Sequence, residues 1–199
     1  MVTASESDRR MRRRSAVRDR ILDAAWRLAR RDGVAAVSLR NLAREVDLTQ
    51  PALYSYFAAK NALYDAMFAQ GCEQLLATVT ERRYGPEPRQ AVKQMVADLV
   101  RFCAADLARA QLLFERPVPT FEPTPESYQL AIRFFDVGSE LLARAGASDP
   151  AHRDIFTALI GGLISQQISN EPGGDRWTRH ADEVVDMFLD HVNRRKDSP

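Results

Sequence analysis

The chain has 199 residues, of which 45% are hydrophobic and 28% are charged, so it is long enough to bury a substantial core in one or two domains. No apolar run approaches the ~18–20 residues of a membrane-spanning helix, which excludes an integral helical membrane protein. The arginine-rich N-terminus is not followed by the apolar stretch of a signal peptide, and we therefore expect a cytoplasmic protein.

The formal net charge is only +1, but the charges are unevenly distributed. Residues 1–60 carry 13 Lys and Arg against 7 Asp and Glu, whereas residues 61–199 carry 15 against 20. A basic N-terminal part on an acidic remainder suits a protein that holds a polyanion at one end. The N-terminal arginines can equally serve only to solvate a tail, and charge alone does not decide between the two.

Residues 1–15 form a basic arm with too few apolar side chains to offset the entropy of ordering, so we expect them to be disordered. Its arginines would contact DNA phosphates, enter a minor groove, or simply remain solvated. A helix is predicted from Ala16 to Arg31, ending at Gly33. Its buried stripe consists of Ile21, Ala25, Leu28 and Ala29.

Residues 39–57 predict two short helices joined by a tight turn. Asp47 stands at the turn, where aspartate tolerates a left-handed backbone better than most residues. Thr49 is placed to cap the second helix, over Gln50–Tyr56, and Pro51 fits its first turn. The side chains of this helix are largely polar or aromatic, which suits insertion into a DNA major groove better than burial in a core. The first helix buries a face formed by Leu39, Leu42, Ala43 and Val46.

The rest of the chain reads as further helices without a convincing strand, which makes the fold class all-α with about nine helices. Cys72 and Cys103 both lie in apolar helical patterns and are expected to be small core residues rather than a disulfide. The breaks are Tyr84–Pro88, the proline-rich Arg116–Pro125, and Asn170–Asp175. The predicted helices span residues 60–82, 89–105, 107–114, 126–144, 150–169 and 176–193.

Residues Arg18 to Met67 resemble the helix-turn-helix domain of the TetR family of transcriptional regulators. In three places the sequence departs from the family pattern: Asp47 and Pro51 replace common glycines, and Ser55 stands where histidine is frequent. These departures leave the geometry possible and are expected to alter which operator is read. The matching positions are Ile21–Ala25, Gly33, Ser38–Ala43, Leu48–Thr49, Leu53–Phe57, Lys60 and Leu63.

The resemblance implies a three-helix DNA-binding head over residues 16–62 and a helical effector-binding and dimerisation body over residues 63–195, with 196–199 as a tail. It implies that the protein binds a palindromic operator in double-stranded DNA as a homodimer, usually as a repressor. Thr49, Gln50, Pro51 and Ala52 would then face base edges. The residues expected to hold the DNA backbone are Ser38, Arg40, Tyr54, Tyr56 and Lys60.

The last two predicted helices are candidates for the dimer interface, because each carries a wide apolar face and family members dimerise through such helices. A glycine pair at 161–162 inside a helix suggests close packing of another backbone. Both faces can instead serve the core of a single chain. The proposed interface residues are Ile155, Leu159, Gly162, Leu163, Gln166, Val184, Val185, Phe188, Leu189 and Val192.

A ligand pocket, if the body has one, should lie among the helices between residues 89 and 169, where aromatic and soft side chains are frequent. The same residues can instead fill an ordinary core. A second similarity to TetR-family bodies, over Arg116–Pro125 and Ala158–Trp177, supports the architecture and identifies no ligand. The pocket candidates are Met95, Leu99, Phe102, Cys103, Phe114, Phe121, Tyr128, Phe134, Phe135, Gln166, Gln167 and Trp177.

An enzyme is not expected, and neither is a cofactor or a bound metal. His152, His180 and His191 are the only histidines and none stands in a metal-ligand pattern. His180 and Glu183 share a helix face, but two ligands are too few for zinc. The alternatives are an architectural DNA-binding protein without an effector, which would have no cavity, and a helical small-molecule carrier or enzyme, which would bind no operator.

Overall fold

A computed structural model describes the backbone of residues 3–196 and the side chains of residues 7–194. Within this range the chain forms nine α-helices and no strand, which confirms the all-α prediction. Two short 3-10 helices, η1 (Val34–Ala36) and η2 (Thr178–His180), lie between them. The α-helices are α1 (Thr3–Asp32), α2 (Leu39–Glu45), α3 (Gln50–Tyr54), α4 (Lys60–Thr80), α5 (Pro88–Ala105), α6 (Leu107–Phe114), α7 (Pro125–Arg144), α8 (Pro150–Asn170) and α9 (Ala181–Lys196).

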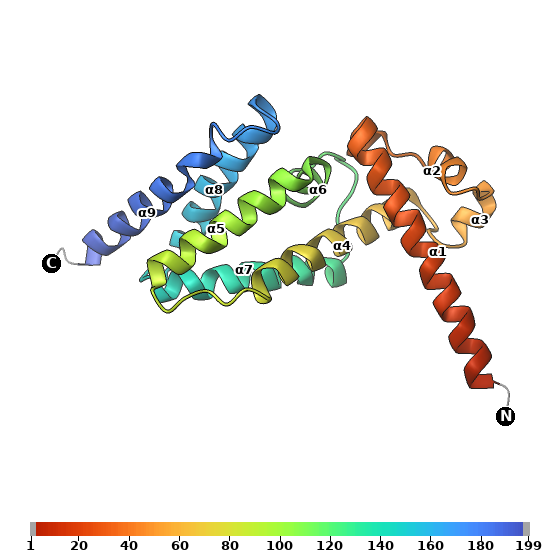
Figure 1. The fold of residues 1–199 in the computed structure, drawn as a ribbon, viewed down its shortest axis with the longest axis horizontal. Coiled ribbons are helices and arrows are strands. Elements are labelled where there is room, and N and C mark those ends of the chain that lie inside the picture. The colour runs from red at the N-terminus through yellow and green to blue at the C-terminus, as the bar shows by residue number, and fades with distance from the viewer. Residues whose placement is uncertain (1–2, 197–199) are drawn as a thin grey trace.

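The molecule is elongated, with α1, α2 and α3 at one end and α8 and α9 at the other (Figure 1). We call residues 3–62 the head and residues 63–196 the body. Helix α4 runs from one to the other and packs along α7 in the body. The first turns of α1 project beyond the rest of the head, so the start of α1 lies far from the end of α9 (Figure 1).

The head is built around a filled hydrophobic cluster. Ile21 of α1, Leu42 of α2, Leu53 of α3 and Phe57 are between 0 and 1% exposed, and Tyr64 near the start of α4 is completely buried beside them. Burying such side chains stabilises a fold by about 1.5–3 kcal/mol each. The cluster therefore fixes α3 against α1 and α2 although α3 is only five residues long.

The body has its own cluster, which joins α4, α5, α7, α8 and α9. The two clusters meet along α4 and α6. Leu113 of α6 packs against both of them, and Leu112 of α6 and Phe121 from the segment before α7 belong to the head cluster. The head and the body are thus packed together rather than joined by a linker alone.

The turn between α2 and α3 confirms the expected role of Asp47, whose φ is 55°. The amide of Leu48 donates to the carbonyl of Ala43 at 2.9 Å and the amide of Asp47 donates to that of Arg44 at 3.4 Å, which is the Schellman arrangement of a helix end. The following helix is capped by Thr49, as predicted. Together these bonds fix the direction in which α3 leaves the turn.

Several predicted boundaries differ from the structure, three of them for an identifiable reason. Helix α1 begins at Thr3, so residues 3–15 are helical instead of disordered. Extending an existing helix costs much less than nucleating one, and Arg, Met and Glu are good helix formers. Helix α3 ends at Tyr54 rather than Tyr56. Helix α9 begins at Ala181 rather than 176, because the Gln167 side-chain oxygen accepts the Trp177 amide at 2.9 Å and holds the preceding residues in a turn.

Candidate DNA interface and ligand cavity

Helix α3 presents its polar face outward because its one fully buried residue is held inside. Leu53 is buried in the head, and Gln50, Pro51 and Tyr54 are exposed around it. The Thr49 hydroxyl oxygen accepts the Ala52 amide at 3.3 Å, so the first turn of the helix is closed without using the exposed side chains. A short rigid helix of this kind can enter a major groove.

The neighbouring helix α2 begins with a comparable cap. The Ser38 hydroxyl oxygen accepts the Asn41 amide at 3.2 Å, and Arg40 in the first turn is exposed. The free amides and positive end of a helix N-terminus attract an anion such as a phosphate. Both helices therefore begin with a capped first turn, and Arg40 is exposed in that of α2.

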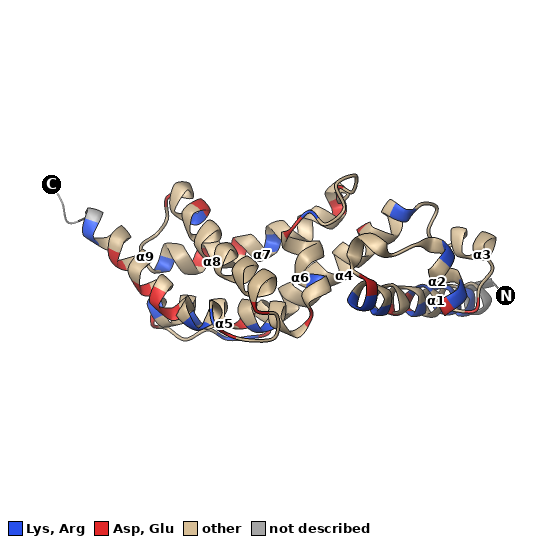
Figure 2. Ribbon diagram, turned by 90° about the horizontal axis from the view of Figure 1, so that it is seen from above, with Lys and Arg blue, Asp and Glu red and all other residues tan. Residues whose placement is uncertain are grey.

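The basic arm lies directly beside α3, which the sequence did not predict. Arg14 donates to the Ser55 carbonyl at 2.6 Å, and its guanidinium carbon lies 5.2 Å from the centre of the Tyr56 ring. Arg18 is stacked over Phe57 at 4.6 Å. Lys and Arg are frequent along α1 (Figure 2). One arginine of the arm, Arg14, is therefore placed at the C-terminal end of α3.

Lys60 is engaged within the head. Its ammonium donates to the Ala35 carbonyl at 3.1 Å and lies 5.2 Å from the ring centre of Tyr64. The Tyr64 hydroxyl in turn donates to the Val34 carbonyl at 2.8 Å. An ammonium has three donors, so a phosphate contact by Lys60 stays a prediction.

All nine predicted DNA contacts lie in the head, and the structure leaves their roles as predictions. Arg40, Thr49, Gln50, Pro51 and Tyr54 are exposed. The half-buried members are Ser38, Ala52, Tyr56 and Lys60.

The predicted dimer face divides into an exposed and a buried part. On α8, Ile155, Leu159, Gly162 and Gln166 are exposed and follow one another at helical spacing, with Leu163 half-buried beside them. Val184 of α9 is half-buried, so its predicted place in a dimer interface stays a prediction. Met187, which was not predicted, is 64% exposed one turn from Val184. An apolar face of this kind on a protein surface commonly marks an interaction site.

The prediction for the other four interface residues is corrected by their burial. Val185, Phe188, Leu189 and Val192 are between 0 and 5% exposed within a single chain and pack in the body cluster. Helix α9 lies against α5 and α8, and its apolar arc is wide enough that most of it is covered by these helices. A residue covered in this way is not available to a second subunit.

The body contains a cavity of about 1020 Å³, whose walls come from α4, α5, α6, α7, α8 and the segment 115–125. This volume is in the range of small-molecule sites in proteins. Its walls are predominantly apolar. The predicted residues that line it are Met95, Leu99, Phe114, Phe121, Tyr128, Phe134 and Phe135.

Five of the pocket candidates lie elsewhere. The Phe102 ring is covered by the Arg109 guanidinium at 3.8 Å, and Cys103 is buried in the core, where desolvation raises the pKa of its thiol to about 12. Gln166 is exposed and bonds Asn170. Gln167 is buried and, with Trp177, forms the turn before α9.

Several wall residues were not predicted, among them Cys72, Phe156 and Glu115. Cys72 and Phe156 belong to apolar helix faces, and periodicity does not separate a core face from a cavity wall. Both cysteines are free thiols, as expected. Glu115 follows the end of α6, where the sequence offered no apolar pattern that would place it inside the body.

The cavity wall and the head share the segment before α7. Phe121 lines the cavity and lies 5.6 Å from the ring of Tyr64 and 6.4 Å from that of Phe68. Just beyond it, the Asp65 carboxylate of α4 accepts bonds from the Thr124 amide at 2.7 Å and the Ser127 hydroxyl at 2.8 Å. A displacement of the cavity wall therefore reaches α4 through direct contacts.

A second bridge joins α1 to α6. Arg30 of α1 donates twice to the buried carboxylate of Asp106, at 2.7 and 2.9 Å. The other oxygen of Asp106 accepts the Arg109 amide at 3.1 Å and so caps α6, whose later residues line the cavity. The head is thus bonded to one end of a helix and the cavity to the other.

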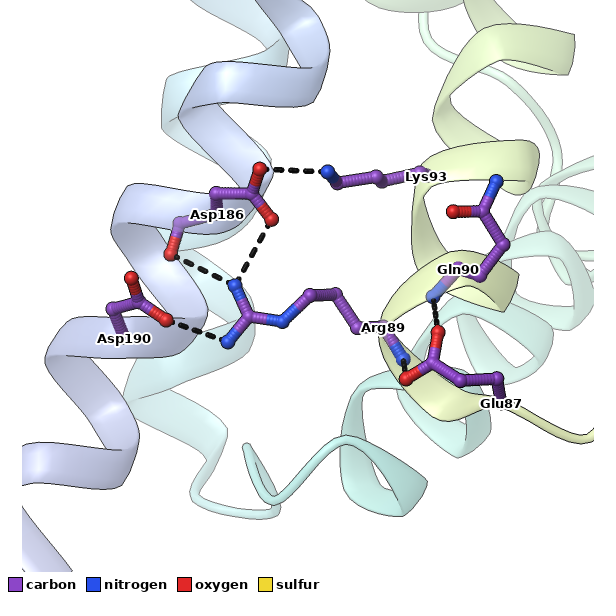
Figure 3. A network of polar contacts seen from close by, with 6 residues as sticks. All are labelled: Glu87, Arg89, Gln90, Lys93, Asp186 and Asp190. Atoms are coloured by element: carbon purple, nitrogen blue, oxygen red, sulfur yellow. Dashed lines mark hydrogen bonds and ion pairs between the residues drawn. The ribbon is translucent and has the colours of Figure 1, made fainter.

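An exposed network holds α9 to α5 at the opposite end of the body (Figure 3). Asp186 accepts bonds from Lys93 at 2.6 Å and Arg89 at 2.9 Å, and Asp190 accepts from Arg89 at 2.5 Å. These cations, Lys93 first, hold the pKa of the Asp186 carboxyl below its usual value. The network fixes α9, while its partner helix α8 keeps an exposed face.

Two negative findings apply to the described residues only. No cluster of three or more His, Cys, Asp or Glu side chains suited to a metal ion occurs among them. None of their helices is long and apolar enough to cross a membrane.

The chain is similar to known regulators over nearly its whole length. The family model for bacterial regulatory proteins of the tetR family matches residues 21–67. The HTH-type nicotine-responsive transcriptional repressor HdnoR of Paenarthrobacter nicotinovorans is 35% identical over 185 residues, which cover 88% of this chain and 95% of that protein. The transcriptional repressor KstR of Mycolicibacterium smegmatis is 30% identical over 181 residues, covering 75% and 89%.

The fold has solved counterparts as well. A crystal structure of a tetR-family regulatory protein from Rhodococcus RHA1 superposes with a TM-score of 0.68 at 18% identity, covering 88% of this chain and 96% of that one. At this identity the likeness concerns the fold.

Proposed function

This chain belongs to the TetR family of bacterial transcriptional regulators, and we propose that it is a cytoplasmic repressor that binds a palindromic operator as a homodimer and is released by a small apolar or aromatic ligand. The observation that carries the DNA-binding part is the exposed, capped start of α3 in a head whose basic α1 reaches the other end of that helix through the bond from Arg14 to the Ser55 carbonyl. Both curated relatives are repressors, which supports the sign of regulation.

The DNA-reading residues follow from the exposed face of α3. Gln50 at the first helical position can pair with an adenine edge by two hydrogen bonds, and the methyl groups of Thr49 and Ala52 can contact a thymine methyl. Tyr54, which is 44% exposed, suits a phosphate contact through its hydroxyl. The arginines of the arm add attraction that does not depend on the base sequence.

Selection of bound duplexes from a random pool tests the DNA part. The expected product is a palindrome, and a non-palindromic or undefined product would contradict the proposal. On the selected duplex, Gln50→Ala should relax preference at one base pair in each half-site and cost about 1–3 kcal/mol there. Tyr54→Phe should weaken binding to all DNA sequences about equally. Ser148, on the exposed α7–α8 turn of the body, offers a control as Ser148→Ala, which should leave binding unchanged.

The dimer is supported by the apolar face of α8, where Ile155, Leu159 and Gly162 are exposed and Leu163 is half-buried. On α9, Met187 is exposed and Val184 is half-buried. The glycine leaves open space where a Cβ would stand, so another helix can approach closely. Two copies related by a two-fold axis would pair α8 and α9 in a four-helix bundle.

Sedimentation of the full chain tests the dimer. Leu159→Lys places a charge on the proposed face and should convert dimers to monomers, with operator affinity falling because half-sites are then bound singly. The control is Arg133→Lys, which keeps a positive charge at an exposed position of α7, and this variant should stay dimeric. A wild-type monomer would end this part of the proposal.

The ligand part rests on the cavity, which an architectural DNA-binding protein would not need. Its contents would press on Phe121, which packs on Tyr64, and on α6, which is bonded to α1 through Asp106. We infer that a ligand changes the angle between the head and the body by these two routes. A library of compact aromatic compounds should contain members that raise the melting temperature and release the operator.

A further inference from the structure

One carboxylate on the cavity wall has no cationic partner. Glu115 is half-buried, and the Ser165 hydroxyl of α8 donates to its carboxylate at the long distance of 3.5 Å. None of the described Lys, Arg or His side chains lies within 4 Å of it in an ion pair. A carboxylate in this position is stable while water reaches it and becomes costly when an apolar ligand displaces that water.

The other charged residues of the wall are already paired. Arg116 contacts Glu122 at 3.0 Å, and Arg153 contacts Asp154 at 3.6 Å. Both arginines and their carboxylate partners are exposed, so water screens these ion pairs. Among the four charged residues of the wall, Glu115 alone is half-buried and without an ion pair.

Exposed aromatic rings on the same wall provide an independent observation. Phe114, Tyr128 and Phe135 are 41, 50 and 37% exposed, and all three line the cavity. Large aromatic side chains are usually more deeply buried than this. A ring face attracts a cation through its quadrupole, so these rings suit both the apolar body of a ligand and an adjacent ammonium group.

We propose that the cavity accepts a protonated amine with a compact aromatic or apolar body, and that the Glu115 carboxylate pairs with its ammonium group. This inference rests on the proposed function, since it names the ligand class of that cavity. A neutral ligand of equal shape would leave the carboxylate dehydrated and unpaired, and an anion would also be repelled by it. Glu115 is thus assigned as the residue that determines ligand charge.

Three probes of nearly equal shape test the assignment: naphthylethylamine, naphthylethanol and naphthylacetate. Calorimetric titration of the full-length protein at neutral pH gives a dissociation constant for each. The amine is expected to bind roughly tenfold more tightly than the alcohol, as charge-assisted hydrogen bonds commonly allow, and the carboxylate is expected to bind most weakly.

Two variants locate the charge effect. Glu115→Gln keeps the size of the side chain and should remove the advantage of the amine while the alcohol still binds. Glu122→Gln removes the neighbouring carboxylate that is paired with Arg116, and it should leave the preference for the amine in place. Equal losses of amine binding in both variants would show a general field effect and would overturn the assignment of Glu115.

The remaining outcomes separate this inference from the proposed function. If amine and alcohol bind equally and both release the selected operator, the ligand class is wrong and the ligand-released regulator stands. If naphthylacetate binds most tightly of the three probes, the proposed ligand class is likewise wrong. If none of the three binds while the operator is still bound, the inference and the ligand part of the proposed function both fail, and the DNA part remains.

Discussion

The head and the body are both helical, yet their interiors differ. The head encloses a filled cluster in which Leu42, Leu53 and Phe57 are at most 1% exposed, and one short helix stands out from it with a fixed orientation. The body leaves about 1020 Å³ open and exposes aromatic rings on the wall. A surface that must match base edges needs a rigid support, whereas a site for a small molecule needs space within the packing.

The largest expected effect comes from truncating the same residue type in the two parts. Phe57→Ala removes a ring that is 1% exposed and lies under Arg18, and it should destabilise the protein by about 3–5 kcal/mol. Phe135→Ala removes a ring that already borders open space, so its cost should be under about 1.5 kcal/mol. Urea unfolding at one protein concentration measures both. Equal costs would contradict the distinction between a filled and an open interior.

The junction between the two parts should give an intermediate effect. Tyr64→Phe removes the hydroxyl that donates to the buried Val34 carbonyl and leaves that oxygen without its partner, at a cost of about 1–3 kcal/mol. Tyr128→Phe alters an exposed hydroxyl in the body and should be nearly neutral. Urea unfolding measures the free energy of unfolding of both variants. An unchanged value for Tyr64→Phe would show that this bond does not hold η1 to α4.

The smallest effect should come from the exposed network of Arg89, Lys93, Asp186 and Asp190 that holds α9 to α5. Because Lys93 and Arg89 lower the pKa of Asp186, this carboxylate stabilises the folded state above its unfolded pKa, and the stabilisation is lost as pH falls through the folded pKa. Asp186→Asn should therefore lower the melting temperature slightly at neutral pH, and by less once the pH falls below the unfolded pKa of aspartate, about 3.9. Its effect should also shrink in high salt. A difference that grows on acidification would contradict this reasoning.

The head was the part that could be read most fully from the sequence. Local signals decide it: Asp47 tolerates the left-handed turn, Thr49 caps α3, and the apolar stripe of α2 is buried as its spacing predicts. What the sequence did not show is that Arg14 would lie on Tyr56. That contact joins residues 42 positions apart and depends on the helix continuing through the arm.

The body was predicted less well because its helices are apolar on more than one side. The spacing of Val185 and Leu189 is the same whether they face α5 or a second subunit, and only the packed structure shows that they are inside. The cavity has the same difficulty, since Met95 on its wall and Cys103 in the core belong to one helix and one periodic pattern. The start of α9 was missed because a side chain ten residues away, Gln167, holds the turn.

Phe121 belongs at once to the wall of the cavity and to the hydrophobic cluster of the head. A substitution there that enlarges or narrows the chamber also alters the support beneath Tyr64. Under the proposed function, a substitution of Phe121 that fits the cavity to another ligand would therefore also change operator affinity.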